Sequence, residues 1–278
     1  MPLHLSQPLE ILIGLWEVGL FTVILWRVVR AIRKSRAAGP ETQREDAYFR
    51  IRAAARTTLP FRPAADAIAY EISVTAYSLF GADRKLVLPG RAFSYHRKNG
   101  YGAIVFGLMI AMLAETGGVH LLLAHFHHPR IALLLTVLSL YGTLWFLGDY
   151  QAAKRRPIRI DADRLAIRTG LRWNLDVPFD EIAKIERPDP FKPFQKGRGA
   201  IRATLFGAPL FVLHLKKPLI ADGPYGRQAR VERVGFTVDE DEEFLAALPG
   251  RAEGNAQPLA LDSPFPLFSG LEAADAGG

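Results

Sequence analysis

The sequence predicts a membrane α-helical protein that carries an α+β domain on the cytoplasmic side of the membrane. Three apolar blocks are each close to the length that a helix needs to cross a bilayer, which predicts three transmembrane helices. Basic residues are concentrated on one side of these blocks, which predicts the orientation of the helices. After the last block, short runs with alternating apolar residues predict a sheet closed by a helix.

The charge of the chain fits this class. A formal net charge of +7 indicates either nucleic-acid binding or a membrane protein with basic flanks. The basic residues lie beside the apolar blocks, so we expect contact with membrane lipids and no nucleic-acid partner. The sequence contains no cysteine, which excludes disulfides, thiolate metal sites and cysteine nucleophiles.

The first apolar block runs from about Leu9 to Val29, with one acidic residue, Glu17, well inside it. A helix needs about 20 residues to cross a hydrocarbon core of about 30 Å. A cleaved signal peptide would place positive charge before its apolar run and small residues after it. Here no Lys or Arg precedes Leu9, and basic residues follow the run, so we expect a retained anchor. These residues are Arg27, Arg30, Arg33, Lys34 and Arg36.

The second block runs from about Gly102 to Ala124 and the third from Ile131 to Gly148. The short link between them, HFHHPR, predicts a transmembrane hairpin. The alternative is a buried helical hairpin in a soluble protein, but few soluble helices are this apolar on all faces.

Lys and Arg near the helix ends predict a multi-pass protein of the cell inner (plasma) membrane. The amino terminus and the hairpin turn are expected outside, since that side offers only Arg130. The cytoplasmic side has the basic residues after the first block and two further groups. These are Arg91, Arg97 and Lys98 before the second block, and Lys154, Arg155, Arg156 and Arg159 after the third.

The chain is expected to have five parts. Residues 1–30 are a transmembrane anchor, 31–100 a cytoplasmic helical linker region and 101–149 the transmembrane hairpin. Residues 150–250 form the cytoplasmic sheet domain, and 251–278 are a tail rich in Gly, Ala and Pro that we expect to be disordered.

In the sheet domain, LRWNLDV shows period-two alternation, with Leu171, Trp173, Leu175 and Val177 on one face. About seven such runs, separated by turn signals, predict about seven antiparallel strands. A helix over DEDEEFLAAL follows, for which Asp239 is the expected N-cap.

Seven short strands followed by a helix is the layout of the pleckstrin-homology fold. The stretch RPIRIDADRLAIRTGLRWNLDVPFDEIAKIE resembles the opening of bacterial pleckstrin-homology-like domains, with Val177-Pro178 and Ile182 in their I-P-x-x-x-I pattern. With FSYHRKNGYGAI and the hairpin, it resembles uncharacterised bacterial membrane proteins in which a helix hairpin precedes such a domain. The resemblance covers roughly residues 93–248. Its motifs are structural, so it implies a fold and no catalytic residues.

Two carboxylates lie inside the predicted membrane helices. Glu17 is eight residues and Glu115 nine residues from the outer ends of their helices, which places both about 12–14 Å deep. His120 lies above Glu115 on the same helix. A carboxylate at this depth is costly unless it is neutral or paired, which makes these residues candidates for a proton or ion site. The alternative is a hydrogen bond between protonated acids that holds the helices together.

The segment HLLLAHFHH gathers histidines near the hairpin turn. Histidine clusters bind transition metals, which makes His125, His127 and His128 weak candidates for an outer-face metal site. The alternative is that they cap helix ends. Membrane di-iron hydroxylases use several separated histidine boxes, whereas this chain has one cluster, so we expect no metal and no cofactor.

A basic loop within FKPFQKGRGAIRATLF is the candidate binding surface of the sheet domain, for a lipid headgroup or a protein partner. A solvated loop is the alternative. The residues are Lys192, Lys196, Arg198 and Arg202.

The expected function is a non-enzymatic membrane-anchored adaptor or regulatory protein whose cytoplasmic domain binds a protein partner, a second copy of itself, or a lipid headgroup. A small ion- or proton-linked membrane protein using Glu17 and Glu115 is the alternative, and a membrane enzyme using the histidine cluster is a third. The sequence has no Walker loop, G-x-S-x-G or H-E-x-x-H motif, so we expect no catalytic residues.

The orientation can be tested with a reporter that is active only outside the cytoplasm. Because the basic residues face inward, the reporter should be active when fused near His127. It should be inactive when fused after Gly39 or at the carboxy terminus. The opposite pattern would refute the orientation.

Overall fold

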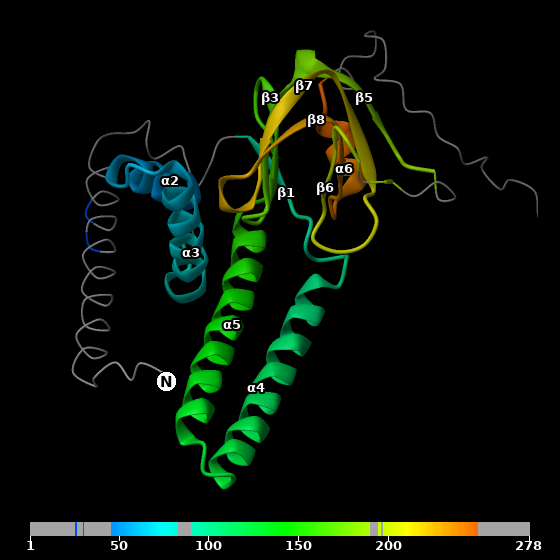
Figure 1. Cartoon of the computed structure of the whole chain (residues 1–278). Coiled ribbons are helices and arrows are strands. Elements are labelled where there is room, and N and C mark those ends of the chain that lie inside the picture. The colour runs from blue at the N-terminus through cyan, green and yellow to red at the C-terminus, as the bar shows by residue number, and fades with distance from the viewer. Residues whose placement is uncertain are drawn as a thin grey trace, which may run out of the picture.

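The computed structural model describes Trp26, Arg30 and residues 46–82, 90–189, 194–195 and 197–249. In this part of the chain, two long helices carry a mixed sheet of eight strands, and a second helix pair lies beside them (Figure 1). Most of the first apolar block, Glu17 included, and the carboxy-terminal tail lie outside the described residues.

The predicted hairpin consists of α4 (Tyr101–His125) and α5 (Pro129–Arg155). Pro129 starts α5, where its missing N–H costs no helical hydrogen bond. The most apolar 18-residue windows of the two helices are only 6% and 17% buried, unlike the core helix of a soluble protein. The structure therefore confirms two helices that are long and apolar enough to span a membrane. Most of the first predicted span, about Leu9 to Val29, lies outside the described residues.

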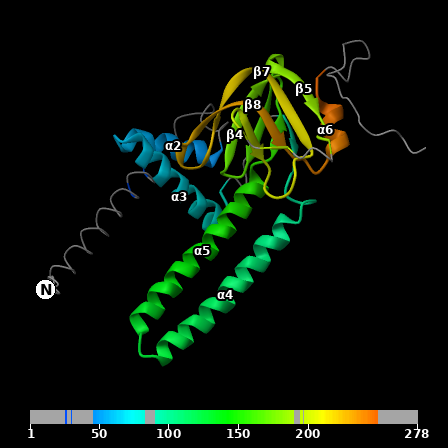
Figure 2. The same cartoon turned by 45° about the vertical axis from the view of Figure 1, so that its right-hand side comes forward.

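A shorter helix pair, α2 (Ala47–Thr58) and α3 (Arg62–Phe80), packs against α5. Asp46 caps α2 by accepting from the Phe49 N–H at 3.2 Å. α3 contacts α5 closely at Gly148, where an added Cβ would lie 2.4 Å from the Val74 carbonyl oxygen. Figure 2 shows α3 on the side of α5 that faces away from α4.

The strands are short except for β7. They are β1 (Arg91–Phe93), β2 (Ile158–Ile160), β3 (Arg164–Thr169), β4 (Trp173–Pro178), β5 (Ile182–Glu186), β6 (Ala200–Ala203), β7 (Phe211–Asp222) and β8 (Gln228–Phe236). Single 3₁₀ turns, η2 (Phe179–Glu181) and η3 (Pro224–Gly226), join β4 to β5 and β7 to β8. The sheet order is β1-β2-β3-β4-β7-β8-β6, and β5 pairs with β7.

This sheet differs from the predicted antiparallel set of about seven strands in two ways. The extra strand, β1, comes from before the membrane hairpin and pairs with β2. β6 pairs with β8 in parallel, so the prediction that all strands are antiparallel is wrong. Alternation within a run reports which face is buried but carries no information on the direction of the partner strand.

The core between the sheet and the carboxy-terminal helix α6 (Asp241–Ala247) is aromatic. Phe244 of α6 lies within 6 Å of three other fully buried rings. The ring-centroid distances from Phe244 are 5.3 Å to Phe93, 5.7 Å to Phe211 and 5.6 Å to Phe236. Phe93, which precedes α4 in the sequence, therefore shares one core with the phenylalanines that follow α5.

Asp239 is not the N-cap of α6, which begins after Glu240. Its carboxylate instead holds the loop that leads into α4. It accepts from the Ser94 hydroxyl at 2.7 Å and from the backbone N–H groups of Arg97 and Lys98, each at 2.9 Å. Burial by itself raises the pKa of Asp239, but these hydrogen bonds outweigh it and hold the pKa below its usual value.

A lowered folded-state pKa makes the Asp239 contribution to stability acid-sensitive. The contribution is complete above the unfolded pKa of about 4 and is lost as the pH falls through the folded pKa. We expect Asp239→Asn to lower the free energy of unfolding at neutral pH by about 1–3 kcal/mol. The stability of the variant should also depend less on pH below about 4 than that of the wild type. Thermal unfolding in detergent, from neutral pH to below about 4, measures this difference.

The exposed Asp163→Asn is the matched control and should follow the wild-type curve. Parallel pH curves for wild type and Asp239→Asn would show that this carboxylate does not anchor the loop.

Candidate functional site

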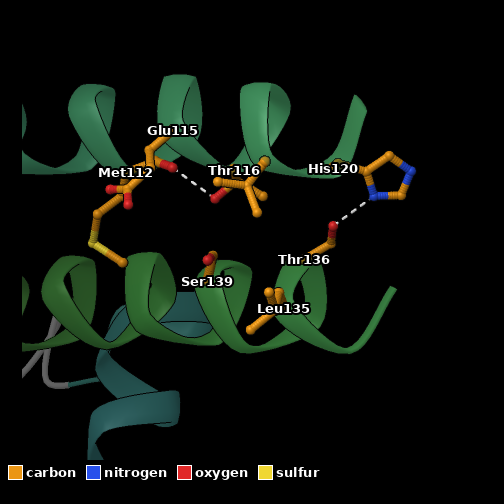
Figure 3. Close-up of a pocket in the computed structure, with 8 residues that line it drawn as sticks. Met112, Glu115, Thr116, His120, Leu135, Thr136 and Ser139 are labelled. Carbon is orange, nitrogen blue, oxygen red and sulfur yellow. Dashed lines mark hydrogen bonds between the residues drawn. The ribbon is translucent and has the colours of Figure 1, made fainter. Parts of the chain in front are cut away.

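A cavity of about 160 Å³ lies between α4 and α5, within the apolar hairpin (Figure 3). Its lining combines three apolar residues with five polar ones, which is unusual for a surface between two such apolar helices. The lining residues are Met112, Glu115, Thr116, Val119, His120, Leu135, Thr136 and Ser139. The spacing of three and four residues on each helix places them along one seam.

The hydroxyl groups in this seam are anchored to the helix backbone. Thr116 donates to the Met112 carbonyl at 2.6 Å, and Thr136 donates to the Ala132 carbonyl at 2.8 Å. The His120 Nδ1 lies 2.8 Å from the Thr136 Oγ1. Since the Thr136 hydroxyl donates to Ala132, this contact suits the His120 tautomer that carries its proton on Nδ1. This leaves the Nε2 of a neutral His120 as a free acceptor.

Glu115 lines the same cavity, one helical turn and a half from His120. Its side chain is exposed, and no described residue forms a hydrogen bond or ion pair with its carboxylate. The structure thus brings together Glu115 and His120, two of the three predicted intramembrane polar residues. The third, Glu17, lies outside the described residues.

The histidines of the hairpin turn are exposed and lie outside this cavity. His125 ends α4, His127 adopts a φ of 61°, and His128 precedes α5. Among the described residues, no group of three or more His, Asp or Glu is arranged to hold a metal ion.

Two residues of the predicted basic loop can be placed, while Lys192 and Lys196 lie outside the described residues. Arg198 is exposed just before β6, and Arg202 within β6 donates to the Phe194 carbonyl at 3.1 Å. Arg233 of β8 lies beside this loop, because its backbone N–H donates to the Gly199 carbonyl at 2.9 Å. No described carboxylate forms an ion pair with these three arginines, which we call the basic edge.

Buried arginines near the carboxy-terminal end of α5 were not predicted to form ion pairs, and Arg156 was counted only among the basic residues that follow the third apolar block. Arg156 is fully buried, with its Nη2 2.8 Å from the Asp46 carboxylate and 2.6 Å from the Asn174 Oδ1. It also donates to the Gly170 carbonyl, and its guanidinium lies 4.9 Å from the Tyr48 ring. These contacts join α2, α5 and the sheet.

Arg172, which lies in the turn between β3 and β4, makes a second connection between the sheet and the helices. It lies 2.9 Å from the Asp149 carboxylate of α5, 3.1 Å from the Tyr101 hydroxyl of α4 and 3.2 Å from the Leu205 carbonyl. A third arginine, Arg52 of α2, bridges Asp66 and Asp222 at 3.0 Å each. The available signal was the set of isolated acids in or beside otherwise apolar or alanine-rich helices, such as Asp46, Asp66 and Asp149.

No protein-family model, curated protein or solved structure matches this chain. The resemblance to bacterial pleckstrin-homology-like membrane proteins therefore stays a prediction, and the function must be argued from the geometry.

Proposed function

We propose that this protein is a non-enzymatic membrane-anchored adaptor or regulator whose cytoplasmic sheet domain binds an acidic protein partner at the basic edge. The basic edge is the observation that carries the proposal. It concentrates three arginines around β6, and no described carboxylate pairs with them. An acidic surface would supply the missing counter-charges and gain bidentate hydrogen bonds from the guanidinium groups.

The position of the basic edge favours a protein over lipid headgroups. Gly199 precedes β6, whereas Leu205 follows it and contacts the inner ends of the membrane helices through Arg172. The four-residue strand separates these two ends by about 13 Å. Arg198 therefore lies at the end of β6 away from the helices, where headgroups of the same bilayer are out of easy reach.

The buried arginines support a regulatory role, because they attach the sheet firmly to the hairpin. Arg172 in the β3–β4 turn pairs with the buried Asp149 of α5, and the buried Arg156 donates to Asn174 of β4, so the sheet and α5 do not separate readily. Binding at the basic edge can thus change the position of α4 and α5 without a flexible joint to absorb the motion.

The finer architecture belongs to the same proposal. We place the chain in the bacterial inner membrane with three spans, the amino terminus outside and a pleckstrin-homology-like domain in the cytoplasm. The antiparallel run β1–β4 and the closing helix α6 support that fold, while the parallel β6–β8 pair departs from it.

Charge reversal at the basic edge tests the proposal. A photoreactive residue at the exposed Arg230 should capture a specific protein in native membranes. Arg198→Glu combined with Arg233→Glu should abolish that capture, because the acidic partner would then be repelled. Glu232→Gln, which removes a neighbouring acid, should preserve or strengthen it.

The matched control is Lys217→Glu, a charge reversal on β7 at a side chain that is 76% exposed. Capture that persists in the double variant, or is lost equally in the control, would contradict binding at the basic edge.

A second candidate, an ion- or proton-linked membrane protein, is favoured by the cavity that holds Glu115 and His120. In liposomes that contain the purified chain, Glu115→Gln should then abolish dissipation of a pH or sodium gradient. The amide keeps the shape of the side chain but cannot ionise, so thermal unfolding should change little. Glu232→Gln is the control, and equal gradient decay in protein-containing and empty liposomes would exclude this function.

A further inference from the structure

The loop between β6 and β7 carries an exposed aromatic residue next to the inner ends of the membrane helices. Phe206 is 55% exposed, and it is followed by Gly207 and Ala208, which are also exposed. In both Figure 1 and Figure 2 this loop hangs from the sheet at the level where α4 begins. We call residues 206–208 the β6–β7 tip.

Arg172 fixes the height of this tip relative to the helices. One guanidinium group contacts the Leu205 carbonyl, the Tyr101 hydroxyl at the first residue of α4 and the Asp149 carboxylate near the end of α5. The residue directly before Phe206 is therefore tied to both apolar helices at the point where they leave their apolar stretch.

The other side of the loop is equally well anchored. The Leu210 N–H donates to the Phe236 carbonyl at 3.0 Å, which holds the loop beside the end of β8. Three residues after Phe236, Asp239 binds the backbone of Arg97 and Lys98. The tip is thus held between the helix ends and a basic segment whose side chains are exposed.

The composition of the loop suits lipid rather than water. Residues 204–209, TLFGAP, contain no charged side chain. Leu205 and Pro209 are buried, so only the tip projects. Gly207 has a φ of 77°, and nothing lies within 4 Å of the Cβ position there, so the loop is open to its surroundings at this residue.

We propose that the β6–β7 tip inserts Phe206 into the interfacial layer of the bilayer that α4 and α5 span. Aromatic side chains favour this layer, and the exposed Arg97, Lys98 and Lys154 lie where anionic headgroups would meet them. The tip is then a third point of contact with the membrane beside the two helices. This inference rests on the two helices spanning the bilayer and is independent of what the basic edge binds.

Because the chain has no cysteine, one introduced cysteine can carry a nitroxide label at a single position. Phe206→Cys in the full chain, reconstituted in phosphatidylcholine–phosphatidylglycerol vesicles, should be relaxed strongly by oxygen and weakly by a water-soluble nickel chelate. Lys217→Cys and Arg198→Cys should show the reverse preference, with several-fold greater nickel accessibility. Ala208→Cys gives a second reading of the tip if the label at 206 disturbs folding.

A label at 206 and at 208 with the same nickel accessibility as Lys217→Cys would overturn the proposal. Shielding from both oxygen and nickel would also overturn it, because that result places the tip against protein instead of lipid.

Discussion

The arrangement of the described chain depends on the burial of the Arg156 guanidinium. A buried charge is tolerated only when ion pairs and hydrogen bonds replace its water. Arg156 takes these from three separate segments: Asp46 before α2, the Gly170 carbonyl in the β3–β4 turn and Asn174 in β4. The segments must therefore come together at the inner end of α5, and the Tyr48 ring closes over the group.

A single connection of this kind would leave the sheet free to turn about α5, but Arg172 supplies a second one. It acts on α4 as well as α5, through Tyr101 and Asp149. Two connections, one of which also holds α4, fix which parts of the sheet lie near the ends of the two helices. The β6–β7 loop is consequently held at the helix ends, and the start of β6 is directed away from them.

Much of this fold is readable from local patterns, and the parts that are not depend on contacts distant in sequence. Uniform apolarity predicted α4 and α5. However, α5 continues past its apolar stretch and ends at Arg155. Alternation predicted the strand around Leu175, but Arg172 lies in a turn, where its N–H donates to the Thr169 carbonyl. β1 was not predicted, since three residues have no strand signal until they meet β2.

For the site, polar residues in an apolar run identified Glu115 and His120. The arginines of the junction were read only as charge, because nothing local shows which acids they meet.

The two helices that line the cavity do not provide a partner for the Glu115 carboxylate. α5 contributes Thr136 and Ser139 to one side of the seam, but the carboxylate still has no described partner and its side chain is exposed. In water this would cost little, whereas at bilayer depth an uncovered carboxylate is strongly disfavoured. In a bilayer, the hairpin would therefore require a further polar group beside Glu115. The first apolar block, which lies mostly outside the described residues, contains such a group in Glu17 at a matching predicted depth. Because His120 lines the same cavity as Glu115, a polar partner for Glu115 would also bear on the proposed proton or ion site.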